Sequence, residues 1–349
     1  MEFTGFYWGY ENLSKIMEER GYDTAAIIGG RTALSVAGDK LAGVLGERLL
    51  GTKVYGVEST DGAIEGILNF KPAQDAQLLL AVGGGKAVDT VKAAGAKMGK
   101  PVITVPTLAS NCSATSGLSV IYSEDGSSSR YDMVPLPVAV LLDGEVMATA
   151  PKEYLWAGIG DGISKEFEVR YATKNRELPP AALMGLNMSP AITRALATYG
   201  KAALEGESGA LEQVIHAIVV TTGYVSSTLS TEEFDYSSSL AHGFYVGALP
   251  FVHGRHLHGE VVSFGTLLQG EFLEEGTTEW LMALNESLGL PTTLEEISMR
   301  AEDLPQVYDS FTETIEYEML PEEVSREDFI GAVLAVDALG RKRKAAGQK

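Results

Sequence analysis

The stretch Leu78-Leu79-Leu80-Ala81-Val82-Gly83-Gly84-Gly85-Lys86-Ala87-Val88-Asp89 decides the fold of this chain. Its apolar first half has the length and composition of a buried strand, and its glycines stand where a strand turns into a helix. Three consecutive glycines remove every Cβ from the turn, so a ligand can approach the backbone. The free N–H groups of the following helix favour a diphosphate, and Lys86 adds positive charge. We therefore predict a phosphate-binding turn; a tight turn without a ligand is the alternative.

Short apolar runs alternate with helical patterns over the first 150 residues, which indicates a parallel sheet with crossover helices. The expected strands are 25–28, 54–57, 78–82, 102–105 and 138–142. From Pro151 onward apolar residues recur at helical spacing instead, as at Leu211, Val214, Ile215, Ile218 and Val219. We expect an α/β domain over residues 1–150 and an all-α domain over residues 151–349.

Composition narrows the classes of partner. The 349 residues include 47 acidic and 27 basic side chains, a formal net charge of −20. We expect no nucleic-acid partner and no anionic membrane, because both select clustered lysine and arginine. The chain lacks an apolar run of about 18 residues, and Met1–Gly5 does not resemble a signal peptide. With a single cysteine, Cys112, it has neither a disulfide framework nor a Cys-rich zinc site. We expect a cytoplasmic protein that acts on a small molecule.

A hydroxyl-rich loop follows the strand expected at 102–105. It reads Pro106-Thr107-Leu108-Ala109-Ser110-Asn111-Cys112-Ser113-Ala114-Thr115-Ser116. Loops at the carboxyl ends of neighbouring parallel strands line one crevice, so we expect this loop beside Gly83–Gly85. Its small side chains would let a flat ring lie close, and its hydroxyls could bond a carboxamide or a phosphate. A polar surface loop without a ligand is the alternative.

The histidines indicate a metal site. Four of the five fall within residues 242–258: His242, His253, His256 and His258. Imidazoles with one carboxylate are a usual ligand set for catalytic zinc or ferrous iron. We choose Asp161 as the carboxylate, because its flanking glycines suggest an accessible helix start; capping that helix is its alternative role. We interpret His253 and His256 as loop histidines, and the fifth, His216, as a structural or exposed residue on a regular helix.

Together these motifs resemble the metal-dependent (iron-type) alcohol dehydrogenase superfamily, and within it the glycerol dehydrogenase branch. The resemblance spans nearly the whole chain and rests on six motifs in order: Gly83-Gly84-Gly85-Lys86 with Asp89-Thr90, Val105-Pro106-Thr107, Leu118-Ser119-Val120-Ile121-Tyr122, Ala157-Gly158-Ile159-Gly160-Asp161, Ala241-His242 and His258-Gly259-Glu260. It implies a dehydroquinate synthase-like fold, with an N-terminal dinucleotide-binding domain and a helical metal-binding domain. The implied activity is an NAD(P)-dependent dehydrogenase acting on CH–OH groups, and the implied assembly is a homo-oligomer.

The resemblance also implies site residues. It assigns Asp161, His242 and His258 as ligands of one divalent metal ion, with zinc expected and iron, nickel or manganese as alternatives. It implies cofactor contacts from Gly83, Gly84, Gly85, Lys86, Asp89, Thr107, Ser110, Ser116, Leu118 and Tyr122.

Two departures from the glycerol dehydrogenase pattern bear on the substrate. Cys112 stands where those enzymes carry an aspartate that contacts the polyol. Lys165 stands one helical turn after Asp161, so its ammonium should point toward the open face of the metal and favour an anionic substrate. Both features resemble hydroxycarboxylate dehydrogenase A, a relative that reduces 2-oxo acids. A solvated lysine, or a salt-bridge partner of Glu166 or Glu168, is the alternative role for Lys165.

Two further departures concern the proton and the cofactor. Tyr245 stands where both relatives usually carry a second histidine, so a proton would pass through its hydroxyl or through water. Gly29-Gly30-Arg31 replaces the acidic residue that favours NAD through the ribose 2′-hydroxyl. NADP is therefore acceptable or preferred, and NAD is not excluded.

These features favour a metal-dependent oxidoreductase that interconverts small 2-oxo acids and 2-hydroxy acids by hydride transfer, with Lys165, Tyr245 and Cys112 as catalytic residues. Oxidation of glycerol or another vicinal diol is the alternative. A dehydroquinate synthase-like cyclase is a remote alternative, because such enzymes carry Gly-Gly-Lys-Thr after the Pro-Thr loop, where Thr115-Ser116-Gly117-Leu118 stands here. A non-catalytic nucleotide-binding protein is a third class, which the retained metal ligands argue against.

Overall fold

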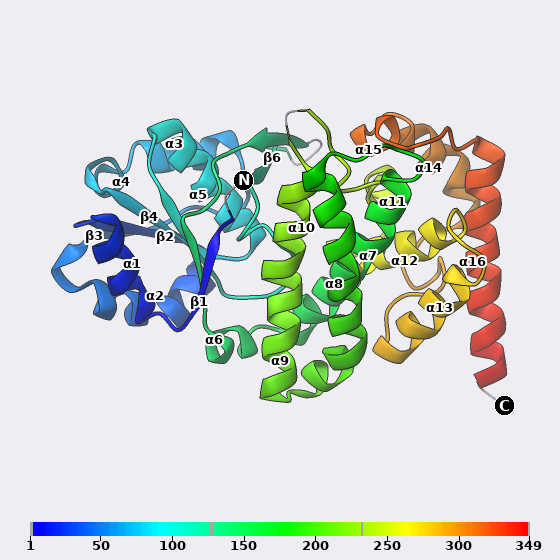
Figure 1. Cartoon of the computed structure of the whole chain (residues 1–349), viewed down its shortest axis with the longest axis horizontal. Coiled ribbons are helices and arrows are strands. Elements are labelled where there is room, and N and C mark those ends of the chain that lie inside the picture. Colours follow the sequence, from blue (N-terminus) through cyan, green and yellow to red (C-terminus); the bar gives the residue numbers. More distant parts are fainter. Residues whose placement is uncertain (1–2, 126–128, 232, 348–349) are drawn as a thin grey trace. The chain divides into compact units, whose positions relative to one another are not determined.

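The computed structural model describes residues 3–125, 129–231 and 233–347. The chain divides into two compact units, Met1–Pro151 and Lys152–Lys349. Figure 1 shows that the first unit combines strands with helices and that the second is built of helices. Within the described residues, no helix has both the length and the apolar character needed to span a membrane.

The first unit is organised around a parallel sheet. Among its described residues, six strands pair in the order β1-β8-β5-β4-β2-β3, all in parallel. They are β1 (Gly5–Trp8), β2 (Ala25–Gly29), β3 (Leu49–Val54), β4 (Leu78–Gly83), β5 (Val102–Pro106) and β8 (Ala139–Leu142). Every residue of β2, β4, β5 and β8 is buried, which explains their uninterrupted apolar runs in the sequence. The expected α/β fold is confirmed.

Helices cover both faces of this sheet. They are α1 (Asn12–Arg20), α2 (Arg31–Leu45), α3 (Asp61–Leu68), α4 (Lys71–Asp75), α5 (Gly85–Met98) and α6 (Gly144–Ala148). Leu80 of β4 belongs to a core that includes residues of α1 and α2. Its neighbour Ala81 belongs to a core that includes residues of α3 and α5. Successive β4 side chains therefore pack against different helix layers, as the alternation of a strand requires.

The structure corrects the strand expected at 54–57. The observed strand, β3, covers Leu49–Val54 and alternates half-buried with exposed residues, because it lies at the edge of the sheet. Such alternation hides an edge strand from a search for apolar runs. The list of expected strands also lacked β1 and the antiparallel pair of β6 (Leu118–Tyr122) and β7 (Ser129–Met133).

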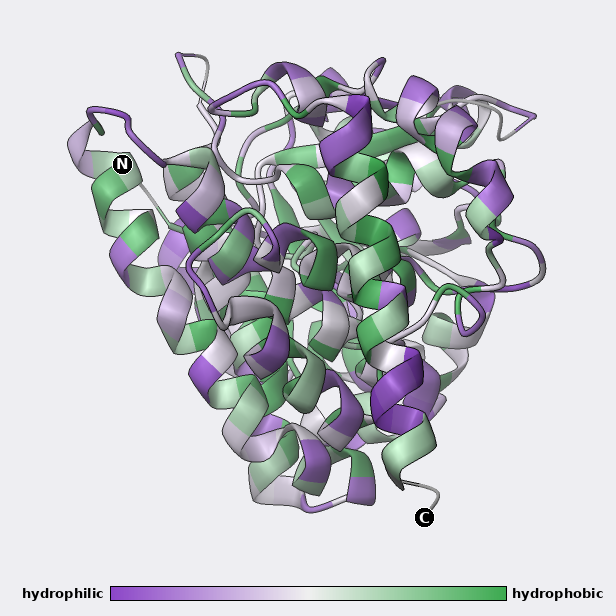
Figure 2. Ribbon diagram, turned by 90° about the vertical axis from the view of Figure 1, so that its right-hand side faces the viewer, coloured by the Kyte–Doolittle hydropathy of each residue, from purple (hydrophilic) through white to green (hydrophobic). Residues whose placement is uncertain are grey.

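The second unit consists of helices packed around α7 (Lys152–Ala172). The others are α8 (Pro180–Glu205), α9 (Ser208–Ile215), α10 (Thr222–Leu229), α11 (Leu240–Ala248), α12 (His258–Gly270), α13 (Thr277–Leu288), α14 (Leu304–Phe311), α15 (Ile315–Glu318) and α16 (Arg326–Gly347). From Ala157 to Val169, every α7 residue except Glu166 is buried, as expected of a helix enclosed on all sides. In Figure 2, hydrophilic and hydrophobic residues alternate along the helices nearest the viewer, the pattern of helices with one buried face.

The helix expected through 211–219 is not regular. Helix α9 ends at Ile215, and His216–Thr221 forms a π-helical segment before α10 begins at Thr222. Nδ1 of His216 lies 3.3 Å from Oγ1 of Thr221. Burial lowers the pKa of His216, which favours the neutral imidazole and agrees with a structural role for this residue.

Candidate metal centre and nucleotide site

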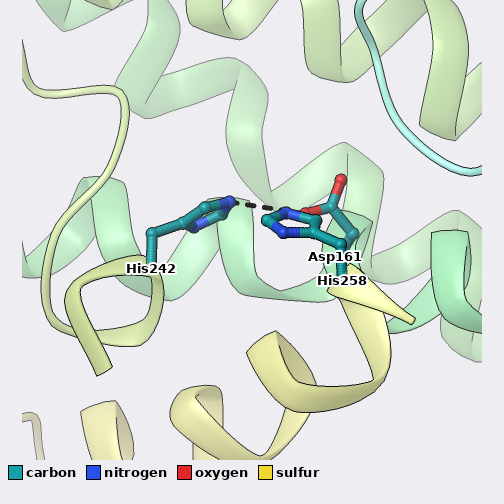
Figure 3. Close-up of side chains that lie close together, drawn as sticks. All are labelled: Asp161, His242 and His258. Carbon is teal, nitrogen blue, oxygen red and sulfur yellow. Dashed lines mark hydrogen bonds and ion pairs between the residues drawn. The ribbon is translucent and has the colours of Figure 1, made fainter. Parts of the chain in front are cut away.

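One carboxylate and two imidazoles converge in the second unit (Figure 3). Oδ1 of Asp161, in α7, lies 3.4 Å from Nε2 of His242, in α11. The same oxygen lies 3.1 Å from Nε2 of His258, the first residue of α12. One donor atom from each residue falls within 4.8 Å of the other two. The structure therefore brings together the metal ligands that the resemblance implies.

The neighbouring histidines lie outside this group. The backbone N–H of His253 donates to the Ser298 carbonyl. Nδ1 of His256 lies 2.9 Å from Oε1 of Glu260, whose other oxygen accepts the Leu257 N–H at the start of α12. These contacts give His256 a place in the capping of α12.

Glycines bring the ligand-bearing helices together. A Cβ on Gly259 would lie 1.9 Å from the Ala157 carbonyl oxygen, and a Cβ on Gly160 would lie 2.5 Å from the Gly259 carbonyl oxygen. Asp161 lies in the middle of α7, so the prediction that its flanking glycines mark a helix start is wrong. The glycines serve close packing of α7 on α12, and this packing sets Asp161 against His258.

The buried carboxylates at this centre need a positive charge close by. Burial alone would raise the pKa of Asp161, but hydrogen bonds from His242 and His258 outweigh burial and hold that pKa well below its usual range. Burial also opposes a charge on His242, yet the carboxylates of Glu168 and Asp161 raise the pKa of His242 to about 10. Buried carboxylates need nearby positive charge. Two imidazoles with a carboxylate suit a divalent metal ion, which would supply that charge while both imidazoles stay neutral.

Glu168 was expected only as an alternative partner for Lys165, but it belongs to this centre. Its buried carboxylate lies 2.8 Å from Nδ1 of His242 and accepts the backbone N–H groups of His242 and Ser239 at 3.0 and 2.9 Å. A histidine that binds metal through one ring nitrogen usually donates the other to a carboxylate or carbonyl. Glu168 thus leaves Nε2 of His242 free to face the Asp161 carboxylate. Its spacing could have identified it in the sequence, because Glu168 stands two helical turns after Asp161 and so on the same face of the helix.

We predict that Glu168→Gln lowers the affinity of the protein for Zn²⁺ by about 10–100-fold, the usual effect of losing such a partner. The reason is that the neutral amide attracts the Nδ1 proton of His242 less than the carboxylate does. Competition with a chromophoric chelator measures this affinity. Glu166→Gln is the matched control, because Glu166 lies on the same helix and pairs with Arg170 instead. Equal affinities in Glu168→Gln and wild type would remove Glu168 from the centre.

Lys165 has a different environment from the expected one. It is 6% exposed, and its ammonium donates to the Ser237 carbonyl. Burial opposes ionisation of Glu168, but the charges of His242 and Lys165 outweigh burial and lower the pKa of Glu168. The Lys165 ammonium thus binds a backbone carbonyl, and its charge favours the ionised form of Glu168. The ammonium has three N–H groups, so it could bind the Ser237 carbonyl and a substrate carboxylate together.

The other proposed catalytic residues have distinct surroundings. Tyr245 lies one turn after His242 in α11, and its ring packs edge-on against His258 with centroids 4.4 Å apart. Cys112 belongs to the first unit, where its carbonyl accepts the backbone N–H and the hydroxyl of Thr115. Tyr245 therefore contacts a candidate metal ligand, whereas Cys112 contributes to the shape of its loop.

The glycine-rich turn joins β4 to α5 in the first unit. Gly83 has a φ of +145°, which side chains rarely adopt. The N-cap of α5 is Gly84, which has no side chain to occupy the first N–H groups of the helix. A Cβ on Gly85 would lie 2.8 Å from Nδ2 of Asn111, so the hydroxyl-rich loop packs directly on the turn. An uncapped helix start beside a polar loop fits a diphosphate group.

The remaining expected cofactor contacts have the following surroundings. Lys86 forms an ion pair of 2.6 Å with Glu58, and its ammonium lies 5.7 Å from the Tyr122 ring centroid. The Thr107 N–H donates to the Gly83 carbonyl. Ser110 and Leu118 are half-buried, and the Ser116 hydroxyl donates to the Ser113 carbonyl at 3.4 Å.

Asp89 is turned into the protein. It is 6% exposed, and its Oδ2 accepts the Val120 N–H at 3.2 Å. Its Oδ1 lies 3.0 Å from the ammonium of Lys92. These contacts give Asp89 a part in holding β6 against α5.

Comparisons with known proteins identify relatives of this chain. A model of the iron-containing alcohol dehydrogenase family matches residues 10–151. The glycerol dehydrogenase of Thermotoga maritima is 34% identical, over 84% of this chain and 83% of its own. Hydroxycarboxylate dehydrogenase A of Escherichia coli is 29% identical, over 83% of this chain and 82% of its own. The crystal structure of glycerol dehydrogenase from Schizosaccharomyces pombe superimposes with a TM-score of 0.87 at 25% identity, covering 100% of this chain and 93% of that one.

Proposed function

Because this chain belongs to the iron-containing alcohol dehydrogenase family and is an oxidoreductase acting on CH–OH groups, we propose that it oxidises a small vicinal diol of the glycerol class. NAD(P)⁺ is the proposed hydride acceptor, and zinc is the proposed metal. The observation that carries the proposal is the convergence of Asp161, His242 and His258, with the Glu168 carboxylate behind His242.

Each residue of the centre has a separate proposed role. A divalent ion with three protein ligands would polarise a substrate oxygen, and a bound nicotinamide would exchange hydride with the substrate carbon. Asp161, His242 and His258 would hold the ion. Glu168 fixes the orientation of His242, because it binds both Nδ1 and the backbone N–H of that residue. The Tyr245 hydroxyl, or water, would take the alcohol proton.

The first unit would hold the dinucleotide. The start of α5, with Gly83–Gly85, offers N–H groups to the diphosphate, and Lys86 adds charge. Arg31 is the exposed first residue of α2, directly after β2 and Gly30. An arginine at this place and the lack of an acidic residue favour acceptance of the NADP 2′-phosphate. We therefore propose that both NAD and NADP serve.

A diol is better supported as the substrate than the 2-oxo acid that Cys112 and Lys165 favour. Relatives from Thermotoga maritima, Pseudomonas putida and Escherichia coli, at 29–34% identity, carry the name glycerol dehydrogenase. The Lys165 ammonium, which was to hold a carboxylate, uses one of its three N–H groups on the Ser237 carbonyl. Reduction of a 2-oxo acid is the second candidate, supported by Cys112, by Lys165 and by the similarity to hydroxycarboxylate dehydrogenase A.

Steady-state reduction of dihydroxyacetone and of 2-oxobutanoate separates these candidates. We predict that the zinc-loaded protein has the higher kcat/KM for dihydroxyacetone, by about tenfold or more, since that difference corresponds to one modest contact of about 1.4 kcal/mol. Lys165→Met should change kcat/KM for both substrates by similar factors, because the Lys165 ammonium binds the Ser237 carbonyl and its charge acts on Glu168. Preference for 2-oxobutanoate, with a KM for that substrate raised selectively in Lys165→Met, would establish the second candidate. Turnover of neither substrate, nor of glycerol with NAD⁺ or NADP⁺, would overturn the proposed function.

A further inference from the structure

Lys92, in the middle of α5, carries a buried ammonium group in the first unit. The residue is 2% exposed, and Nζ lies 3.0 Å from Oδ1 of Asp89, one turn earlier on the helix. The ammonium also donates to the carbonyl oxygens of Ser113 at 2.7 Å, Ser116 at 3.1 Å and Leu118. One positive charge thus gathers a carboxylate and several carbonyls from a short segment of the chain.

These contacts are what a buried ammonium requires. A lysine ammonium has three N–H groups, and leaving any of them unpaired away from water is costly. The segment 113–118 in turn directs carbonyl oxygens toward one point, where they would repel each other without a cation. Neither arrangement is stable alone, so the lysine and the segment fix each other.

Asp89 extends this connection to the next strand. Its Oδ1 pairs with Lys92, and its Oδ2 accepts the N–H of Val120, in β6. The backbone from 113 to 120 is thereby attached to α5. The same helix begins at the glycine-rich turn, and Ser113 reaches that turn directly: its Oγ would lie 3.4 Å from a Cβ on Gly85. Ser116 and Leu118, whose carbonyls Lys92 binds, are expected cofactor contacts.

We propose that Lys92 is a positioning residue for the dinucleotide: its ammonium holds segment 113–118 in the conformation that receives the cofactor. This inference rests on the proposed function, because it concerns the cofactor of that reaction. Lys92 is buried beneath the segment and acts through it. Its loss should weaken cofactor binding and leave the metal centre intact, because the metal residues belong to the second unit.

The test compares Lys92→Met with Lys97→Met. Methionine retains length and apolar bulk but removes the ammonium. Lys97 lies on the same helix and is half-exposed, 3.7 Å from Asp61, so its replacement removes the same charge elsewhere. Nucleotide fluorescence gives the Kd for NADH and NADPH, chelator competition gives the Zn²⁺ affinity, and hydrogen exchange reports on residues 107–122. We expect at least a tenfold rise in nucleotide Kd and faster exchange at 113–120 in Lys92→Met only, with Zn²⁺ affinity within twofold of wild type.

Chemical rescue distinguishes positioning from a general loss of stability. In Lys92→Ala, ethylammonium can enter the space of the missing side chain and restore the charge, so we expect it to lower the nucleotide Kd at least threefold without changing that of wild type. If neither variant folds, Lys92→Arg keeps the charge on a planar guanidinium that cannot reproduce the ammonium contacts, and the same rise in Kd is expected. A nucleotide Kd in folded Lys92→Met equal to that of wild type would overturn the inference alone. Failure of wild type to bind either nucleotide would overturn the proposed function and this inference together.

Discussion

Asp161→Asn should remove bound metal from the protein and lower kcat/KM for a diol by about 10³-fold, the equivalent of the several kcal/mol that a metal contributes by polarising oxygen. The physical reason is that Oδ1 of Asp161 is the point on which His242 and His258 converge, at 3.4 and 3.1 Å. Asparagine keeps the shape of the side chain but cannot balance the charge of a divalent ion. Metal content by mass spectrometry and steady-state kinetics measure the two effects.

The control for this experiment is Glu153→Gln. Glu153 lies near the start of the same helix, is half-exposed and pairs with Arg255 at 3.3 Å. This variant should keep its metal and its activity. Asp161→Asn with one metal ion per chain and near-normal turnover would show that Asp161 is not a ligand.

Gly259→Ala should have the second large effect, although it adds a single methyl group. That Cβ would lie 1.9 Å from the Ala157 carbonyl oxygen, and backbone cannot rotate away as a side chain can. Overpacking typically costs about 1–3 kcal/mol. At the upper end this corresponds to a fall of about 6–12 °C in the Tm of a unit of this size. Separation of α7 from α12 would also move His258 away from Asp161, so Zn²⁺ affinity should fall as well.

Gly331→Ala is the matched control for the glycine variant. Gly331 lies inside α16, and a Cβ added there would meet no atom within 4 Å. Alanine is the better helix former, so Tm should stay constant or rise slightly. Thermal unfolding and chelator competition should be measured on both variants. Unchanged Tm and metal affinity in Gly259→Ala would show that the close contact of α7 and α12 does not position the ligands.

Burial explains which parts of the fold the sequence could predict. The strands β2, β4, β5 and β8 are enclosed on both faces, so their apolar runs are continuous and visible. The edge strand β3 alternates half-buried and exposed residues and contains Gly51, and its pattern does not distinguish it from a loop. The π-helical segment at His216–Thr221 has no counterpart in apolar spacing, because the residues on either side stay helical.

In the site, too, residues that stand in recognisable motifs could be predicted, and residues whose role depends on the fold could not. Asp161, His242 and His258 stand in motifs with characteristic neighbours, so the resemblance could identify them. Glu168 has no such motif, and its role appears only when α11 places the backbone of Ser239 and the ring of His242 against it.

The contacts of two lysines, Lys165 and Lys92, could not be predicted from the sequence either. Lys165 was expected to face the metal, and its ammonium also binds the Ser237 carbonyl, 72 residues away in the chain. The sequence around Lys92 indicates an ordinary helix lysine, yet its ammonium is buried under a loop that follows more than 20 residues later in the chain. The spacing of residues in the sequence does not predict contacts between segments this far apart. Such contacts determine which charged groups remain available to a ligand.

The most direct test of the account is the rate of NAD(P)⁺ reduction with glycerol or 1,2-propanediol, before and after metal removal. We predict that chelation lowers the rate to about 1% or less, in line with the contribution of a metal that polarises oxygen. About one equivalent of Zn²⁺ or another divalent ion per chain should restore it. An undiminished rate in protein shown to be free of metal would contradict the assignment of Asp161, His242 and His258 as the centre of a metal-dependent dehydrogenase.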